Sequence, residues 1–181
     1  NEIVLPVLKY LNIEKLDWVV MSHPHSDHIG GLVSLINEVK IDTVWDSFIP
    51  YKSWTYNTII SRAESNEVHV IHPHQGQVMK LSDNVFVEFF APDSIFAVTE
   101  HNVNNASIVF KLSYGETSVL FTGDLEHEGD QFLLSYENML KVNVLKVAHH
   151  GSITSTTASL LDFIQPNIAV VSVGRKNKFS H

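Results

Sequence analysis

The sequence predicts a layered α/β fold, and three observations lead to this class. Residues 15–73 alternate strand-like and helix-like stretches in the order strand, helix, strand, helix, strand. Four more stretches between residues 77 and 124 all have the composition of strands. Clusters of polar residues also follow three of the predicted strands, and α/β proteins build their sites at such strand ends.

Each element is predicted from the spacing of its apolar residues, with a period of two for strands and a period near 3.6 for helices. The predicted strands cover residues 15–21, 41–48, 67–73, 77–81, 85–92, 107–115, 117–124, 141–150 and 167–174. The predicted helices cover residues 3–11, 32–39, 53–65, 127–140 and 154–164. Ser53 is expected to cap the third helix, and Gly30 and Gly31 allow tight backbone before the second.

Length and composition fit one globular domain over residues 1–181, since 44% hydrophobic residues can fill a core. No apolar run approaches the roughly 20 residues that span a bilayer, and the first residues lack the features of a signal peptide. The chain starts without methionine and ends directly after a strand-like stretch. We therefore expect a fragment, truncated at its N-terminus and also at its C-terminus.

The net charge and the absence of cysteine limit which ligands the chain can bind and which side chains can hold a metal. The formal net charge of −8 argues against broad electrostatic binding to a polyanion. Because the chain has no cysteine, any metal must be held by His, Asp or Glu side chains. Such donors favour zinc, iron or manganese over copper(I).

The densest polar cluster is "HPHSDH", which follows the strand over 15–21 and precedes a helix. Alternate residues of an extended loop project the same way, so His23 and His25 can converge on one cation. Asp27 and His28, at the helix start, can point to a second cation. A solvated loop that is rich in histidine by chance is the alternative.

Five motifs carry a resemblance to a known family. "HPHSDHIGGL" resembles the metal-binding signature of the metallo-β-lactamase superfamily, and "VLFTGDLE" and "VLKVAHHGS" resemble its later ligand strands in the same order. Together with "NNASIVFKL" and "VVSVGRKNKFSH", they look most like the soluble domain of ComEC-type DNA-internalisation competence proteins, and next like phosphorylcholine esterases. The resemblance implies a four-layer αβ/βα sandwich with one or two divalent metal ions, and N-terminal strands that are missing here.

The later motifs supply the other expected ligands. Asp124 follows an apolar strand, and its two oxygens can bridge two cations; capping the next helix is the alternative role. Successive residues of a strand face opposite ways, so one of His149 and His150 is expected to bind metal, with His149 preferred. His150 would then orient that ligand or the substrate. The expected metal ligands are His23, His25, Asp27, His28, Asp124 and His149.

The pattern departs from the superfamily where many members supply a further histidine, because "HNVNNASIV" stands there. We expect Asn104, Asn105 and Ser107 to contact substrate or a metal-bound water, with a structural turn as the alternative. His101 is a weaker ligand candidate in the same segment. His181, near the end of the resemblance, could protonate a leaving group together with the catalytic residues Asp27 and His150, or be a frayed terminus.

The predicted function is metal-dependent hydrolysis with two ions of zinc or manganese. The resemblance selects a phosphodiester substrate, specifically single-stranded DNA during competence uptake, and implies a fused or associated membrane channel domain and a location on the extracytoplasmic side of a bacterial membrane. A small phosphodiester hydrolase and a non-catalytic metal-binding domain stay open as alternatives. The second His-Pro-His, in "IHPHQG", lacks an Asp-His pair and a following helix, so we expect no catalytic metal there.

Overall fold

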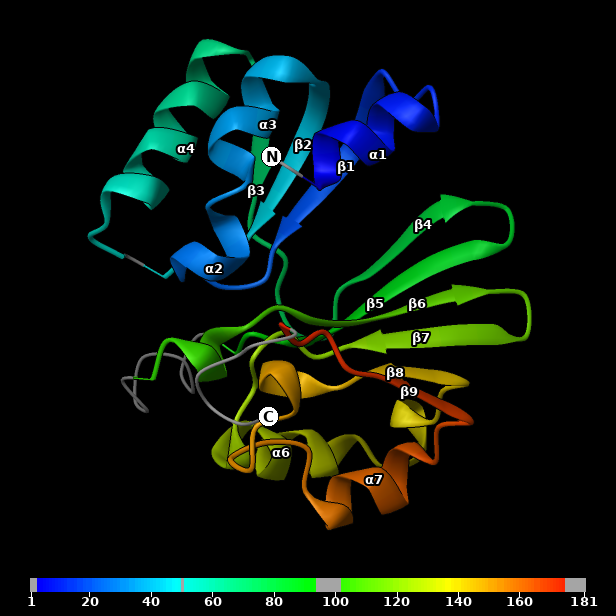
Figure 1. Cartoon of the computed structure of the whole chain (residues 1–181). Coiled ribbons are helices and arrows are strands. Elements are labelled where there is room, and N and C mark those ends of the chain that lie inside the picture. The colour runs from blue at the N-terminus through cyan, green and yellow to red at the C-terminus, as the bar shows by residue number, and fades with distance from the viewer. Residues whose placement is uncertain (1–2, 50, 94–101, 175–181) are drawn as a thin grey trace. The chain divides into compact units, whose positions relative to one another are not determined.

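The computed structural model describes residues 3–49, 51–93 and 102–174. The chain divides into two compact units, Asn1–His72 and Pro73–His181, which are described here one at a time (Figure 1). Among the described residues, no helix is long and apolar enough to cross a membrane.

The first unit is a parallel three-stranded sheet with helices. Its strands β1 (Lys15–Met21), β2 (Lys40–Asp46) and β3 (His69–Ile71) lie in the order β1-β2-β3. Its helices are α1 (Val4–Tyr10), α2 (Ser26–Ile29), α3 (Leu32–Glu38) and α4 (Trp54–Ser65). Because the strands are parallel, the segments that follow β1, β2 and β3 leave from the same edge of the sheet.

One apolar core joins the helices of the first unit to its sheet. Val44 of β2, Ile59 and Ala63 of α4 are fully buried, and apolar residues of the other three helices belong to the same cluster. Trp45, on the opposite face of β2 from Val44, stacks on Trp18 with ring centroids 4.5 Å apart. The helices therefore rest on one face of the sheet, and the other face carries the tryptophan pair.

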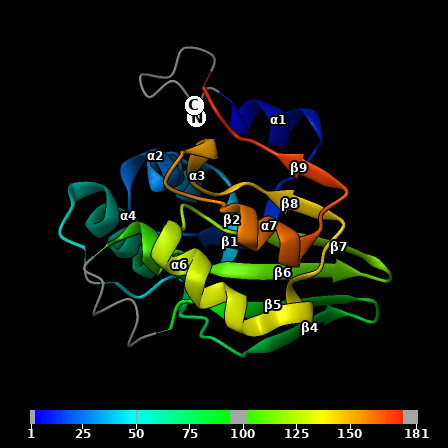
Figure 2. The ribbon, with the colours of Figure 1, turned by 90° about the horizontal axis from the view of Figure 1, so that it is seen from below.

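The second unit is a mixed six-stranded sheet. Its strands are β4 (Val78–Ser82), β5 (Val85–Ala91), β6 (Val109–Tyr114), β7 (Thr117–Phe121), β8 (Val144–Lys146) and β9 (Ile168–Val170), in chain order across the sheet. The pairs from β4 to β7 are antiparallel, and β8 and β9 join in parallel. Helices α6 (His127–Leu133) and α7 (Ala158–Ile164) cover the same face of this sheet (Figures 1 and 2).

Most predicted elements are confirmed, and the errors concern two regions of the second unit. The single helix predicted over 127–140 is wrong: α6 ends at Leu133, and a 3-10 segment, η2 (Leu134–Leu140), follows with Glu137 at φ 46°. The strand predicted over 141–150 is also too long, because β8 ends at Lys146 and a turn, η3 (Ala148–Gly151), holds the two histidines. Apolar periodicity cannot register a local left-handed residue, so it missed both breaks.

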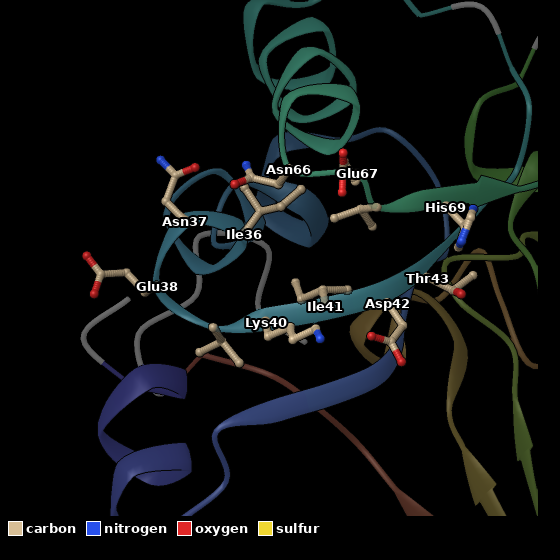
Figure 3. Close-up of a pocket in the computed structure, with 12 residues that line it drawn as sticks. Ile36, Asn37, Glu38, Lys40, Ile41, Asp42, Thr43, Asn66, Glu67 and His69 are labelled. Carbon is tan, nitrogen blue, oxygen red and sulfur yellow. The ribbon is translucent and has the colours of Figure 1, made fainter.

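A surface hollow of about 760 Å³ in the first unit is lined by residues 36–43 and 66–69 (Figure 3). Lys40 and His69 begin β2 and β3, so the hollow lies at the amino ends of these strands. The histidine-rich loop leaves the carboxyl end of β1, at the other edge of the sheet. The hollow is therefore separate from the polar residues that the sequence singles out.

Candidate metal centre

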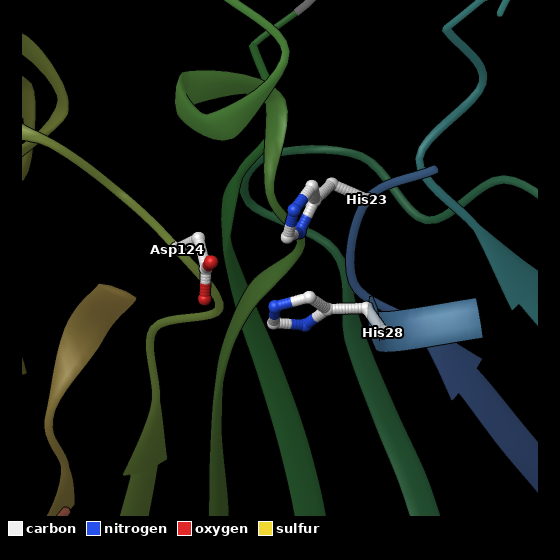
Figure 4. Close-up of side chains that lie close together, drawn as sticks. All are labelled: His23, His28 and Asp124. Atoms are coloured by element: carbon white, nitrogen blue, oxygen red, sulfur yellow. The ribbon is translucent and has the colours of Figure 1, made fainter. Parts of the chain in front are cut away.

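The first half-site is the loop from Ser22 to Gly30, between β1 and α3. His23 is fully buried, while the Asp27 side chain is 67% exposed. Helix α2 is a single turn, and the backbone N–H of Ile29 donates to the His25 carbonyl at 3.1 Å. This turn brings His28 back beside His23, with ring centroids 4.2 Å apart (Figure 4).

Ser22 orients both of these rings. Its Oγ lies 3.2 Å from His23 Nδ1 and 3.4 Å from His28 Nδ1. His23 Nε2 lies 3.0 Å from His25 Nδ1, close to the roughly 3.3 Å expected between two ligands of one tetrahedral ion with bonds of about 2 Å. His23 and His25 therefore have the spacing of a chelating pair. Sequence reasoning missed Ser22, whose position directly before the motif is its only signal.

Gly30 and Gly31 differ in how much space surrounds a Cβ atom at each position. A Cβ at Gly30 would lie 2.5 Å from the Ser26 carbonyl oxygen, closer than real Cβ contacts allow. A Cβ at Gly31 would meet nothing within 4 Å, and Gly31 has an ordinary φ of −65°. Only Gly30 is thus required by the close packing of the α2 turn.

The second half-site begins at Asp124, on the loop after β7 (Figure 4). Asp124 is only 3% exposed, and its backbone N–H donates to Ser107 Oγ at 3.0 Å. Gly123 has φ 54°, a left-handed conformation that suits glycine. Helix α6 begins at His127 with Glu126 as its N-cap residue, so Asp124 is not that helix's cap.

His149 and His150 lie in a turn and not on a strand, which corrects the argument that they face opposite ways. Both have left-handed backbone, with φ 43° and 56°. Ser155 Oγ donates to the Ala148 carbonyl at 3.0 Å, and the Ala148 N–H donates to Thr156 Oγ1 at 3.2 Å. Thr157 caps α7, whereas Ser155 and Thr156 hold the histidine turn.

The turn presents both histidines to Asp124. Asp124 Oδ2 lies 3.5 Å from His150 Nε2 and 4.0 Å from His149 Nε2. His150 Nδ1 must carry a proton, because it lies 2.8 Å from the Ser172 carbonyl oxygen, which can only accept. A neutral His150 ring therefore has its lone pair on Nε2, toward Asp124. Both histidines thus lie beside this carboxylate, and the expectation that one of them binds metal stays a prediction.

Glu126 is a second residue of the candidate site that sequence reasoning missed. Its Oε1 lies 3.1 Å from His149 Nδ1, and its carboxylate accepts hydrogen bonds from the Asn102 and Asn104 side-chain amides at 2.6 and 3.0 Å. A carboxylate on Nδ1 fixes the tautomer in which Nε2 can bind a metal, and it raises the basicity of the ring. The adjacent "GDLE" sequence was the available signal.

The three residues expected to contact substrate lie in and after η1 (Asn104–Ala106). Asn105 and Ser107 are buried and bond to the loop that carries Asp124: Asn105 Oδ1 accepts from the Glu126 N–H at 2.8 Å. Asn104 Oδ1 is buried and has no hydrogen-bond partner among the described residues. Asn105 and Ser107 thus shape the half-site, and Asn104 keeps an acceptor for a water or substrate group; substrate contact by any of the three stays a prediction.

Charge inside the second unit favours a cation near Asp124. Burial lowers the pKa of Lys146, although the negative charge of Asp124 opposes that shift. The Lys146 ammonium donates to the Val147 carbonyl at 2.7 Å, so it is not directed only at the carboxylate. Imidazole and carboxylate donors without any thiolate fit zinc, manganese or iron.

The second His-Pro-His motif has a different environment. His72 Nδ1 lies 3.2 Å from the Asp46 carbonyl oxygen and 3.6 Å from Asp46 Oδ2, and His74 Nδ1 bonds to the Gln75 carbonyl. Burial raises the pKa of the Asp46 carboxyl, which accepts from the Tyr56 hydroxyl at 2.7 Å. His101 and His181 lie outside the described residues, so their expected roles stay predictions.

Comparison with curated proteins gives similarity over the length of the chain. The chain is 29% identical over 183 residues to ComE operon protein 3 of Bacillus subtilis, covering 100% of this chain and 23% of that protein. It is 29% identical to Recombination protein 2 of Haemophilus influenzae and 27% identical to competence protein ComA of Neisseria gonorrhoeae, covering 98% of this chain and 21% and 23% of those proteins. The chain thus spans less than a quarter of these relatives.

Solved structures show the same fold at low identity. CmlA, a diiron β-hydroxylase from Streptomyces venezuelae, matches with a TM-score of 0.56 and 13% identity over 86% of this chain and 35% of that one. Igni18, a metallo hydrolase from Ignicoccus hospitalis, matches with a TM-score of 0.50 and 17% identity over 88% of this chain and 64% of that one. The predicted fold class is confirmed by these neighbours.

The family model that matches is described as the metallo-beta-lactamase superfamily, and it covers residues 2–175. The predicted resemblance to competence proteins is likewise confirmed by the curated relatives. The chain belongs to the metallo-beta-lactamase superfamily.

Proposed function

We propose that this chain is a metal-dependent phosphodiesterase that binds two divalent ions. The observation that carries the proposal is the pair of imidazole Nε2 atoms 3.5 and 4.0 Å from the buried Asp124 carboxylate. A buried carboxylate beside two basic nitrogens is costly unless a cation or protons neutralise it. The family, in which such donors hold divalent metals, makes a cation the better explanation.

The residues divide between the two ions. His23 and His25, at chelating distance, would hold one ion, and Asp27 and His28 would hold the other. Asp124 and His149 would be further ligands. When bound, two such ions supply a hydroxide nucleophile near neutral pH and neutralise charge on the attacking and leaving oxygens.

The chain's own groups do the remaining work. Ser22 holds the rings of His23 and His28 in place, and Glu126 keeps a proton on His149 Nδ1 so that Nε2 stays a donor. Asp27, whose side chain is 67% exposed, can accept a proton from an attacking water at the open side of the loop. His150 positions Asp124 or serves as a ligand, and His181 is the proposed donor to the leaving group.

Single-stranded DNA is the proposed substrate. One curated relative is named a competence protein and another a recombination protein, and a phosphodiester is the bond that a hydrolase would cut in DNA. The same relatives suggest a membrane channel domain in the longer protein and a position on the extracytoplasmic side of a bacterial membrane.

A small phosphodiester is the second candidate substrate. The net charge of −8 favours it, because polyanion binding usually relies on clustered Lys and Arg. A non-catalytic metal-binding domain is the third possibility, motivated by Asn104 and Asn105 in place of an expected histidine.

The test supplies the chain with manganese or zinc and measures metal content, hydrolysis of bis-p-nitrophenyl phosphate, and cleavage of single-stranded DNA. We expect two metal equivalents, activity on both substrates, and loss of both activities in Asp27→Ala. Hydrolysis of the small ester without DNA cleavage would select the small-substrate candidate. Bound metal without hydrolysis in a longer chain that includes the preceding segment would select the binding domain.

A further inference from the structure

The segment between β2 and α4 carries large aromatic side chains that are open to solvent. Phe48 is 69% exposed and Trp54 is 73% exposed. Tyr51 lies between them in the sequence and is partly buried. Rings of this size normally contribute to a core, so their exposure together on one short segment suggests a binding role.

Phe48 packs on the exposed ring of His72, which faces the buried Asp46. It has φ 58°, an uncommon conformation for a non-glycine residue, and its ring centroid lies 4.5 Å from that of His72. His72 Nδ1 in turn faces Asp46, which is 1% exposed and also accepts from the Tyr56 hydroxyl. The exposed Phe48 ring therefore packs against His72, which itself contacts Asp46.

Tyr51 and Trp54 also have defined positions, and Tyr51 lies beside His25 of the histidine loop. The Tyr51 ring lies edge-on to the His25 ring, with centroids 5.8 Å apart. Trp54 is the first residue of α4, and the Ser53 side chain caps that helix by accepting from the Tyr56 N–H at 3.1 Å. A ligand lying along the segment would therefore pass next to His25, a proposed metal ligand.

We propose that Phe48 and Trp54 stack unpaired bases of single-stranded DNA on either side of the phosphodiester that is cut. This inference rests on the proposed function, and it supplies the binding energy that the negative net charge denies to phosphate contacts alone. Exposed Lys52 adds one cation between the two rings in the sequence. Because bases in a duplex are already stacked, the segment discriminates against double-stranded DNA.

The test measures binding of a fluorescein-labelled oligothymidine by anisotropy, using Asp27→Ala as the parent so that the strand stays intact. We expect Trp54→Ala and Phe48→Gly to weaken binding roughly 5- to 100-fold each. Trp54→Phe, which keeps a ring, should retain most of the affinity. Glycine is chosen at residue 48 because it adopts φ 58° without strain.

Tyr114→Ala is the matched control, because that ring is 66% exposed at the end of β6 in the other unit. It should bind the oligonucleotide like the parent. Raising salt from about 50 to 200 mM should weaken parent binding less than about tenfold, since few phosphates are neutralised. Melting curves identify any variant that fails to fold. Trp54→Phe then takes the place of that variant in the comparison with the parent, and fluorescence quenching by solvent is measured.

The proposal is overturned if the parent does not bind the oligonucleotide, if it binds duplex equally well, or if Trp54→Ala and Phe48→Gly bind within twofold of Tyr114→Ala. The proposed function fails separately, if the unsubstituted chain holds metal and hydrolyses neither substrate. If Trp54→Ala and Phe48→Gly both keep bis-p-nitrophenyl phosphate hydrolysis and both bind the oligonucleotide like the parent, the stacking proposal alone is overturned.

Discussion

The two half-sites contrast in how the chain builds them. The first occupies residues 22–30, and one helical turn brings the buried His23 ring and the partly buried His28 ring together. The second draws on the loop after β7, the turn after β8 and the η1 segment, which the parallel pairing of β7 with β8 and side-chain hydrogen bonds bring together. A site made from one contiguous segment depends on local backbone geometry, whereas a site made from three depends on tertiary contacts that can each be removed.

Asp124→Ala is expected to have the largest effect on metal content and hydrolysis, because Asp124 is the proposed ligand of both ions. Asp124→Ala should leave at most one metal equivalent and lower the hydrolysis rate by about a thousandfold or more, because a charge that neutralises two ions is lost. Metal analysis and bis-p-nitrophenyl phosphate turnover check this. Asp162→Ala removes an exposed carboxylate from α7 and should change neither; an Asp124→Ala protein with two ions would show that the half-sites bind independently.

The next effect should be confined to the second half-site. Glu126→Ala is expected to weaken metal binding about 10- to 100-fold, because His149 loses the carboxylate on Nδ1. Glu126→Gln should lose less, since its amide oxygen can still accept from that nitrogen. Competition with a chelating dye measures the affinity, and nitrogen NMR of the imidazole reports the tautomer.

Glu128→Gln is the control for that experiment. Glu128 accepts a hydrogen bond from Asn105 Nδ2 at 3.1 Å, whereas the carboxylate on His149 Nδ1 belongs to Glu126. Backbone and Asn105 hydrogen bonds lower the pKa of Glu128, so it is ionised at neutral pH. Equal loss of metal in Glu126→Gln and Glu128→Gln would mean that loop folding, and not the histidine contact, controls affinity.

A smaller effect should separate the two glycines of the first half-site. Gly30→Ala is expected to lower the free energy of unfolding by about 1–3 kcal/mol, because its Cβ would press on the Ser26 carbonyl oxygen. Gly31→Ala should stay within about 0.5 kcal/mol of the parent, since nothing lies near its Cβ. Urea titrations of both variants decide the matter, and equal destabilisation would contradict the packing argument.

The smallest effect is expected in the second His-Pro-His motif. His74 is exposed and bonds through Nδ1 to the neighbouring Gln75 carbonyl, so His74→Ala should leave metal content and turnover within about twofold of the parent. Metal analysis beside His23→Ala gives the contrast between the two motifs. Loss of a metal equivalent from His74→Ala would reverse their ranking.

The same contrast explains how much the sequence could predict. The strand over 15–21, the histidine loop and the helix capped by Ser53 were all predicted, because local spacing and capping determine them. Glu126 was missed because its role depends on His149, which lies far along the chain and meets it only through strand pairing. The two left-handed histidines were placed on a strand because apolar periodicity says nothing about φ at a single residue.

The central claim is the proposal that the chain binds two divalent ions and that Asp124 is a ligand of both. Electron paramagnetic resonance of the manganese-loaded chain tests it most directly, because two Mn²⁺ ions that share a bridging ligand are magnetically coupled. We predict a coupled spectrum at two manganese equivalents that changes to an isolated-ion spectrum in Asp124→Ala. An isolated-ion spectrum from the unsubstituted chain at two equivalents would contradict the account.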